Sequence, residues 1–165
     1  FRKETQIEQS KRAIELINGQ DMVSETSFGL GMPDETPESI RRAIELAKDY
    51  APDLAFFLAI APWPYAEMYE ELRPYIEVTD YRRYNLVEPV VKPKAMTLEQ
   101  LRGELLRATR EFYMDKMKRY RSFSEHKRTF LVKVMKIMAE HSYLGAEMRA
   151  VGHELPADIK ELAGT

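Results

Sequence analysis

Residues 24–69 contain the pattern that decides the fold. They begin with Ser24-Glu-Thr-Ser-Phe-Gly-Leu-Gly-Met-Pro-Asp-Glu-Thr36, continue with Pro37-Glu-Ser-Ile-Arg-Arg-Ala-Ile-Glu-Leu-Ala-Lys48, and then run from Pro52-Asp-Leu-Ala-Phe-Phe-Leu-Ala-Ile-Ala to Pro62-Trp-Pro-Tyr65. This order predicts a strand, a turn rich in glycine and proline, an amphipathic helix and a second apolar strand. Such a β-α-β unit indicates an α/β fold with a parallel sheet. Because one unit cannot cover both faces of its own strands, we expect further elements around it.

The two predicted strands, residues 22–30 and 54–61, differ in pattern. In the first, alternation places Glu25, Ser27 and Gly29 on one face and mostly apolar side chains on the other. We expect the apolar face to lie under helices and the polar face to point toward the centre of a sheet or barrel, where a ligand could approach. The second strand is apolar throughout, which is typical of a strand covered on both faces.

The rest of the chain is mainly helical in pattern, with capping residues that mark where helices begin. The predicted segments are a helix from a capping box at Thr5 to Gly19, a helix from Thr36 to the residue before Pro52, a short helix over residues 66–72, a short edge strand over residues 87–91, a helix from Thr97 through Met117, and a long last helix from Ser124 to Gly152.

Length, charge and composition limit the classes of protein that this chain can be. Its 165 residues suit one domain, which could bury roughly 70% of the unfolded surface. With 25 basic and 27 acidic residues the net charge is −2, so we expect no nucleic-acid partner. The chain has no cysteine, which excludes disulfides, thiolate metal sites and a cysteine nucleophile within it.

No apolar run is long enough to suggest a membrane span, and we expect a cytoplasmic protein. A helical pattern begins within a few residues of Phe1. We therefore expect a piece of a longer polypeptide, with a trimmed tag or a processed terminus as the alternatives. His126, His141 and His153 form no recognised metal-ligand spacing, and we expect them at the surface or at helix caps.

One stretch departs from the overall charge balance. Residues 110–136 contain nine basic and three acidic side chains. We interpret the part from Lys116 to Lys136 as a solvated helix face, with a docking site for an anionic substrate, an anionic lipid surface or an acidic partner as the alternative. The methionines at 114, 117, 135 and 138 are expected in the core rather than on a binding surface.

Three segments resemble radical S-adenosylmethionine (radical SAM) enzymes. The run Phe28-Gly-Leu-Gly-Met-Pro-Asp-Glu-Thr36 resembles the F-x-x-G-x-P-x-E-T turn that follows the fourth barrel strand of that family. The run Ala61-Pro-Trp-Pro-Tyr-Ala-Glu-Met-Tyr69 resembles its T-P-x-P-G-T-x-x-Y segment after the fifth strand. Residues 80–101 resemble the sixth-strand region of the cobalamin-binding branch. Together with Phe112-Tyr-Met114 and the basic tail, they resemble most closely the anaerobic magnesium-protoporphyrin IX monomethyl ester oxidative cyclase group.

The resemblance implies the carboxyl-terminal half of a partial (β/α)6 barrel with parallel strands, over residues 1–110, followed by a helical extension over residues 111–165. The parent enzyme would use SAM and a 4Fe-4S cluster, and the resemblance to the cobalamin-binding branch implies cobalamin as a third cofactor. It would remove hydrogen from a hydrophobic or tetrapyrrole substrate. The partner of this chain would be the remainder of the parent polypeptide. A homo-oligomer of the fragment is possible, and a membrane surface is not expected as a partner.

This sequence departs from the family at positions that carry its chemistry. The three-cysteine cluster motif and the Gly-Gly-Glu segment are absent, so the chain alone is expected to hold no cofactor and to be inactive. Tyr65 and Ala66 stand where relatives have Gly-Thr, beside the expected adenine site. Ser27 stands where many relatives place an acid or an amide.

The resemblance points to six cofactor-binding candidates and to no catalytic residue or metal ligand. Each candidate also has an ordinary structural reading: filling a wet barrel interior, relieving crowding at a turn, or packing. Trp63 could stack on a planar ligand or simply pack beside its two prolines. The alternative functions are a fragment of a radical SAM methyltransferase or methylthiotransferase, and a non-catalytic helical self-association module. The cofactor-binding candidates are Glu25, Ser27, Gly29, Gly31, Ala61 and Pro62.

Overall fold

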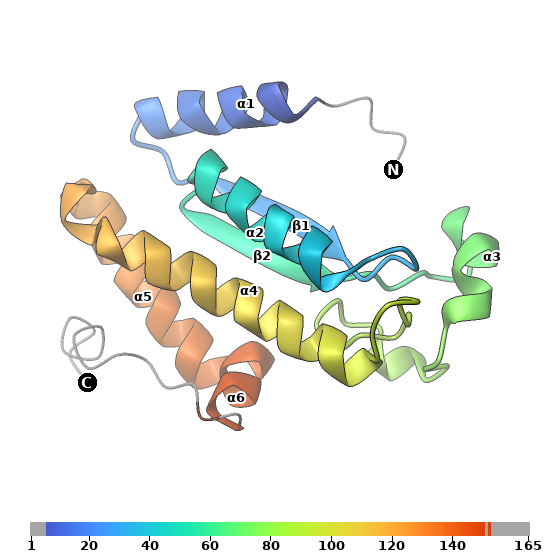
Figure 1. Cartoon of the computed structure of the whole chain (residues 1–165). Coiled ribbons are helices and arrows are strands. Elements are labelled where there is room, and N and C mark those ends of the chain that lie inside the picture. Colours follow the sequence, from blue (N-terminus) through green and yellow to red (C-terminus); the bar gives the residue numbers. More distant parts are fainter. Residues whose placement is uncertain (1–5, 151, 153–165) are drawn as a thin grey trace.

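The computed structural model describes residues 6–150 and 152, which form an α/β fold around a two-stranded parallel sheet. Figure 1 shows α2 in front of the sheet, α4 running alongside the sheet and below it in the view, α1 above α2, and α5 and α6 on the side of α4 away from the sheet. The elements are α1 (Ile7–Gly19), β1 (Glu25–Leu30), α2 (Pro37–Tyr50), β2 (Leu54–Ala59), α3 (Met68–Leu72), the 3-10 turns η1 (Arg73–Tyr75) and η2 (Tyr81–Arg83), α4 (Leu98–Lys118), η3 (Tyr120–Ser122), α5 (Glu125–His141) and α6 (Tyr143–Ala150).

The predicted pair of parallel strands is confirmed. β1 and β2 pair in register from Glu25 opposite Leu54 to Leu30 opposite Ala59, and both are shorter than the predicted ranges. Phe28 of β1 stacks on Phe57 of β2 with ring centroids 5.4 Å apart. Among the described residues, β1 has no strand on its other side, so that edge of the sheet is free.

Local sequence signals fix α2 as predicted. The Thr36 side chain accepts a hydrogen bond from the backbone of Ser39, Pro37 occupies the first helical position, and Ala51 ends the helix in a left-handed conformation. The apolar stripe of α2, whose side chains are fully buried, packs against α4 and the sheet. The amphipathic pattern of α2 thus builds one wall of the core.

The other helix starts follow the same rules, with one difference. Thr97 caps α4 and Ser124 caps α5, as predicted. α1 begins with a capping box in which Gln6 and Gln9 take the two roles, and Thr5 lies outside the described residues. α4 runs unbroken across residue 110, where the sequence predicts the start of the extension.

The edge strand predicted over residues 87–91 is wrong. The Asn85 side chain accepts hydrogen bonds from the backbone of Val87 and Glu88, at 3.0 and 2.9 Å, and Pro89 has no N–H to donate. Val91 forms only an isolated antiparallel bridge with Ile76. The segment instead packs into a second, small core cluster, because its own side chain and proline remove the donors that a strand ladder needs.

The single long last helix is also wrong. It breaks at Ser142, whose backbone is extended and whose side chain accepts a hydrogen bond from the N–H of Gly145 at 2.9 Å. A Cβ on Gly145 would clash with the carbonyl oxygens of Met138 and Ala139, so the close return of α6 onto α5 requires glycine there. Within residues 6–150, no helix is both long and apolar enough to cross a bilayer.

Candidate functional site

The carboxyl ends of β1 and β2 lie side by side at one edge of the sheet. The N–H of Ile60 donates to the carbonyl of Leu30 at 2.8 Å, so the pairing continues to the last residue of β1. Ligands of parallel α/β folds bind beyond this end of the strands. Gly31, Ala61 and Pro62 follow the two strands directly, so the structure places all three at the carboxyl end of the sheet.

The candidates Glu25, Ser27 and Gly29 lie along the exposed face of β1, as the alternation predicts. Opposite them, Phe56 and Leu58 of β2 are only half-buried, so this face is open in the described chain. Gly29 is four residues along β1 from Glu25, a separation of about 13 Å at the usual rise per residue. Glu25 therefore lies at the amino end of the strand, Ser27 near its middle and Gly29 toward its carboxyl end.

Gly31 has a packing role that the geometry makes explicit. Its φ is +96°, and a Cβ there would come within 2.8 Å of a methyl carbon of Leu101 on α4. Its N–H donates to the Glu35 carboxylate at 3.2 Å, which also accepts a hydrogen bond from Ser39 at the start of α2. Glycine is needed here for backbone conformation and for the approach of α4, and a contact with a ligand stays a prediction.

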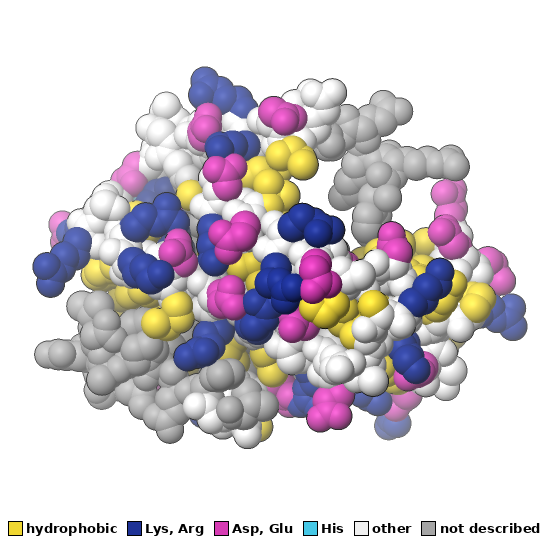
Figure 2. All heavy atoms as spheres, in the orientation of Figure 1, with side chains coloured by type: hydrophobic (Ala, Val, Ile, Leu, Met, Phe, Trp, Pro, Cys, Tyr) yellow, Lys and Arg dark blue, Asp and Glu magenta, His cyan; other side chains and the backbone are white. Residues whose placement is uncertain are grey.

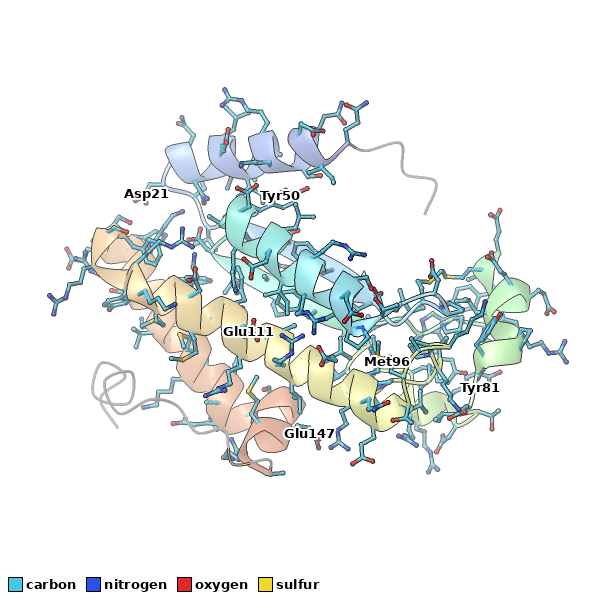
Figure 3. The ribbon with its side chains drawn as sticks, in the orientation of Figure 1. Asp21, Tyr50, Tyr81, Met96, Glu111 and Glu147 are labelled. Atoms are coloured by element: carbon cyan, nitrogen blue, oxygen red, sulfur yellow. The ribbon has the colours of Figure 1, made fainter. Side chains whose placement is uncertain are left out.

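Ala61 and Pro62 are buried where β2 leads into the second core cluster. Trp63 follows them, half-buried, with its ring centroid 6.4 Å from Tyr65 and 5.5 Å from Tyr84. Figure 3 labels Tyr81, near α3, at the opposite end of the molecule from Asp21. The carboxyl end of the sheet is thus bordered by glycines on one strand and by aromatic rings on the other.

A polar network that the sequence reasoning missed closes the amino end of the same sheet. The Asp53 carboxylate, 6% exposed, accepts hydrogen bonds from the Lys127 ammonium at 2.7 Å and from the backbone N–H of Ser24 at 2.9 Å. Lys116 lies 3.7 Å from Asp53 and donates to the Pro52 carbonyl at 2.8 Å. The Asn18 side chain accepts from both Lys127 and Ser24. Five segments, from α1 to α5, are joined by this network around Asp53.

Burial and charge shift the pKa values of this network in the same direction. Burial lowers the pKa of Lys116 to about 8, and the attraction of Asp53 only partly opposes this. Burial alone would raise the pKa of Asp53, but hydrogen bonds from Lys127 and Ser24 and the charge of Lys116 bring it below its ordinary value. The shift of Lys116 thus reflects its burial, and the shift of Asp53 reflects its pairing with the two lysines and Ser24.

The sequence contains one signal from which part of this network could have been predicted. Ser24 and Asp53 are the polar residues directly before the two strands, and parallel pairing in register places such residues next to each other. Lys116 and Lys127 belong to the basic stretch predicted as a solvated face, and for these two that prediction is wrong because they point inward. On the face of α2 and α4 in Figure 2, basic and acidic side chains are interspersed, without a field of one sign.

The histidines and methionines mostly follow expectation. His126 and His141 are exposed on α5, and His153 lies outside the described residues. Met117, Met135 and Met138 pack in or against the main core, whereas Met114 is exposed. Within the described part of the chain, no group of three or more acidic or histidine side chains is arranged to hold a metal ion.

Comparison with known proteins shows which proteins this chain is similar to. The chain is 40% identical over 116 residues to the anaerobic magnesium-protoporphyrin IX monomethyl ester cyclase of Cereibacter sphaeroides, and 39% identical over 114 residues to that of Rubrivivax gelatinosus. The chain is a relative of these anaerobic cyclases. The matches cover 70% and 69% of this chain but 19% and 20% of the cyclases. The chain thus spans about one fifth of their length.

A third relative of the chain carries a different name. An uncharacterized methyltransferase of Pyrococcus horikoshii is 33% identical over 90 residues, covering 53% of this chain and 20% of that protein. No family model matches the chain. The resemblance to the cyclases, stated from the motifs at the ends of both strands, is confirmed, and the relation to a methyltransferase keeps the alternative open.

Proposed function

We propose that this chain is the carboxyl-terminal part of a radical SAM enzyme of the cobalamin-binding type, most like the anaerobic magnesium-protoporphyrin IX monomethyl ester cyclase. The observation that carries the proposal is the identity of 40% over 70% of the chain, in a protein whose parallel strands have a free edge and an open face. Parallel sheets are normally covered on both faces, so a pair with one open face suits a part of a larger barrel.

In this proposal the open face of β1 is one wall of a chamber for SAM and substrate. Ser27 can offer a hydroxyl to a ribose, and Gly29 allows a ligand to approach the backbone. Beyond the strand ends, the backbone of Ala61 and Pro62 would border an adenine ring. Gly31 is less suited to direct contact because Leu101 occupies the space beside it. Glu25, near the other end of β1, would contact a different part of the ligand or only solvent.

The residues of this chain do not fit an iron–sulfur cluster, because no cysteine is present to ligate one. The cluster, SAM and any cobalamin would belong to the parent enzyme, where they would supply the radical that removes hydrogen from the substrate. This chain would position SAM and substrate and exclude water from them. We therefore expect it to be inactive alone.

A methyltransferase of the same superfamily is the second candidate, favoured by the relative from Pyrococcus horikoshii. Both candidates need the same wall and differ in what the parent enzyme does with the substrate. Product analysis of the assembled parent separates them: loss of hydrogen and ring closure for a cyclase, or gain of a methyl group for a methyltransferase. A non-catalytic self-association module is the third, non-enzymatic alternative.

The coding sequence directly upstream of Phe1 gives the first test. An in-frame three-cysteine cluster motif supports the proposal, whereas a start codon just before Phe1 supports the non-catalytic module. The second test is reconstitution. The upstream polypeptide and this chain, mixed under anaerobic reducing conditions with SAM, should together release 5′-deoxyadenosine, and this chain alone should release none. Release that does not depend on the chain would contradict the proposal.

A further inference from the structure

Trp63 lies between two tyrosines just beyond the carboxyl end of β2. Its ring centroid is 6.4 Å from that of Tyr65 and 5.5 Å from that of Tyr84. Both distances are those of interacting aromatic pairs. Tryptophan and tyrosine are the side chains that a one-electron oxidant attacks most readily besides those that contain sulfur, and an electron can cross such short gaps between them. The three residues are therefore connected for electron transfer.

The two tyrosines differ in whether they can release the phenolic proton. Tyr84 is 4% exposed, and its hydroxyl donates to the Val78 carbonyl at 3.0 Å. A backbone carbonyl accepts a hydrogen bond but is not a base, and burial raises the pKa of Tyr84. Tyr65 is 86% exposed, so water can take its proton. Because the oxidation of a tyrosine at neutral pH releases that proton, Tyr65 is the easier of the two to oxidise.

Trp63 connects the carboxyl end of the sheet with the surface. It follows Ala61 and Pro62 in the chain and is half-buried against the second core cluster. The planes of the Trp63 and Tyr65 rings differ by only 10°, so the inner ring is followed by an outer ring that lies nearly parallel to it. The order from inside to outside is a buried tyrosine, a half-buried tryptophan and an exposed tyrosine.

We propose that Trp63 and Tyr65 form an exit path that carries oxidising equivalents from the carboxyl end of the sheet to the surface. The inference rests on the proposed function, in which carbon-centred radicals react at this end of the sheet. In the path, Trp63 gives the hydrogen atom of its indole N–H to a carbon-centred radical that has missed its substrate. A C–H bond forms and an indolyl radical remains, because the indole N–H bond is weaker than the C–H bond gained.

Tyr65 completes the transfer. It gives one electron to the indolyl radical and its hydroxyl proton to water, while the indole nitrogen takes a proton from water. Trp63 is then restored, and the net change is one hydrogen atom moved from Tyr65 to the carbon-centred radical. The remaining tyrosyl radical lies on an exposed side chain, where a soluble reductant can repair it.

Trp63 is the only tryptophan of the chain, so the path can be tested in the 165-residue chain without the parent enzyme. Azide radicals made by pulse radiolysis oxidise tryptophan in preference to tyrosine, and the products are azide, a proton and the indolyl radical of Trp63. Transient absorption should then show the indolyl band decaying while the tyrosyl band grows at the same rate. That rate should not depend on the protein concentration, because the transfer occurs within one chain.

Matched variants separate the path from mere proximity. Tyr65→Phe keeps the ring but removes the hydroxyl, so most of the tyrosyl growth should be lost and the indolyl radical should persist. Tyr84→Phe removes the hydroxyl of the ring that lies nearer to Trp63 and should leave the transfer unchanged. Tyr81→Phe changes a half-exposed ring 5.1 Å from Tyr84 and should also leave it unchanged. This variant tests an exit by way of Tyr84 even if Tyr84→Phe does not fold.

Unchanged transfer in Tyr65→Phe overturns the inference. An equal loss of transfer in Tyr84→Phe or Tyr81→Phe also overturns it, since the hole would then leave Trp63 by the buried side. In the reconstituted parent, SAM turnover without substrate should give a tyrosyl signal in electron paramagnetic resonance, and Tyr65→Phe should lack it. The same signal in that variant rejects the path.

These results are separate from the proposed function. Release of 5′-deoxyadenosine by the reconstituted parent, together with unchanged transfer in Tyr65→Phe, rejects only the exit path. Failed reconstitution, together with the expected loss of transfer in Tyr65→Phe, rejects the parent enzyme and leaves electron transfer from Tyr65 to Trp63 established.

Discussion

The two ends of the small sheet are built in opposite ways. At the amino end, Asp53 and two buried lysines tie five segments together with short polar contacts and no open surface. At the carboxyl end, β1 ends in glycines, its outward face is open, and exposed aromatic rings follow β2. In parallel α/β folds the amino end of the strands serves stability and the carboxyl end serves ligands. We propose the same division of roles for this sheet, and each prediction below tests it.

The largest effect is expected from removing the central carboxylate of the amino end. Asp53→Ala leaves Lys116 and Lys127 buried without a counter-charge, and it leaves the N–H of Ser24 without its acceptor. Breaking a buried ion pair in this way costs about 3–5 kcal/mol. Urea denaturation of the chain should show a loss of this size. As a control, Glu70→Ala removes a carboxylate that is 76% exposed and should change the stability by less than about 0.5 kcal/mol. A similar small change for Asp53→Ala would mean that the amino end is not the stable end.

A smaller loss of stability is expected from Gly31→Ala at the carboxyl end of the sheet. The left-handed φ and the methyl carbon of Leu101 together should cost about 2 kcal/mol. Gly103→Ala in α4 is the matched control, because a Cβ there meets nothing within 4 Å and alanine favours a helix. That change should stabilise the chain by about 0.5–1 kcal/mol. If both variants gave the same result, the contact with Leu101 would not explain Gly31.

The pH dependence of the stability tests the buried network at the amino end of the sheet. Lys116 has its pKa lowered to about 8 in the folded chain, while in the unfolded chain a lysine keeps its ordinary value of 10.5. Between these two values the unfolded state binds more protons, so the free energy of unfolding rises with pH. We expect a rise of about 1–2 kcal/mol from pH 7.5 to pH 9.5, measured by urea denaturation. Lys116→Met should reduce this rise of the free energy of unfolding with pH. If the rise is unchanged in the variant, a group other than Lys116 causes it.

The smallest effect on stability is expected on the open face of the sheet. Ser27→Ala removes an exposed hydroxyl and should change the free energy of unfolding by less than about 0.5 kcal/mol. In the reconstituted parent, the same variant should weaken SAM binding by about fivefold to tenfold, the value of one lost hydrogen bond. If Ser27→Ala lowered the free energy of unfolding as much as it lowered the free energy of SAM binding, Ser27 would serve stability as well, and the two ends would not differ in role.

The parts of this fold that sequence predicts are those with local causes. The caps at Thr36, Thr97 and Ser124 act within three residues, and the apolar stripe of α2 repeats every three or four residues. The parallel pairing was predicted from two strands joined by a helix. The alternation of polar and apolar residues in β1 predicted the exposed face that carries Ser27 and Gly29.

The parts that sequence did not predict depend on contacts that a local pattern cannot contain. The strand expected over residues 87–91 loses its donors to the side chain of Asn85. The long last helix ends where Ser142 and Gly145 let α6 fold back. The Asp53 network joins residues up to 109 positions apart, and the charge run gave no sign that two of its lysines point inward.

The distance along the chain between Asp53 and Lys127 bears on the order in which the molecule takes shape during synthesis. Lys127 follows Asp53 by 74 residues. When β2 leaves the ribosome, its neighbouring acid has neither lysine partner, and burying that acid alone would be unfavourable. The segment from α1 to β2 must therefore keep this end hydrated until α4 and α5, which carry the two lysines, have been translated. α4 and α5 then fix β1 and β2 in place.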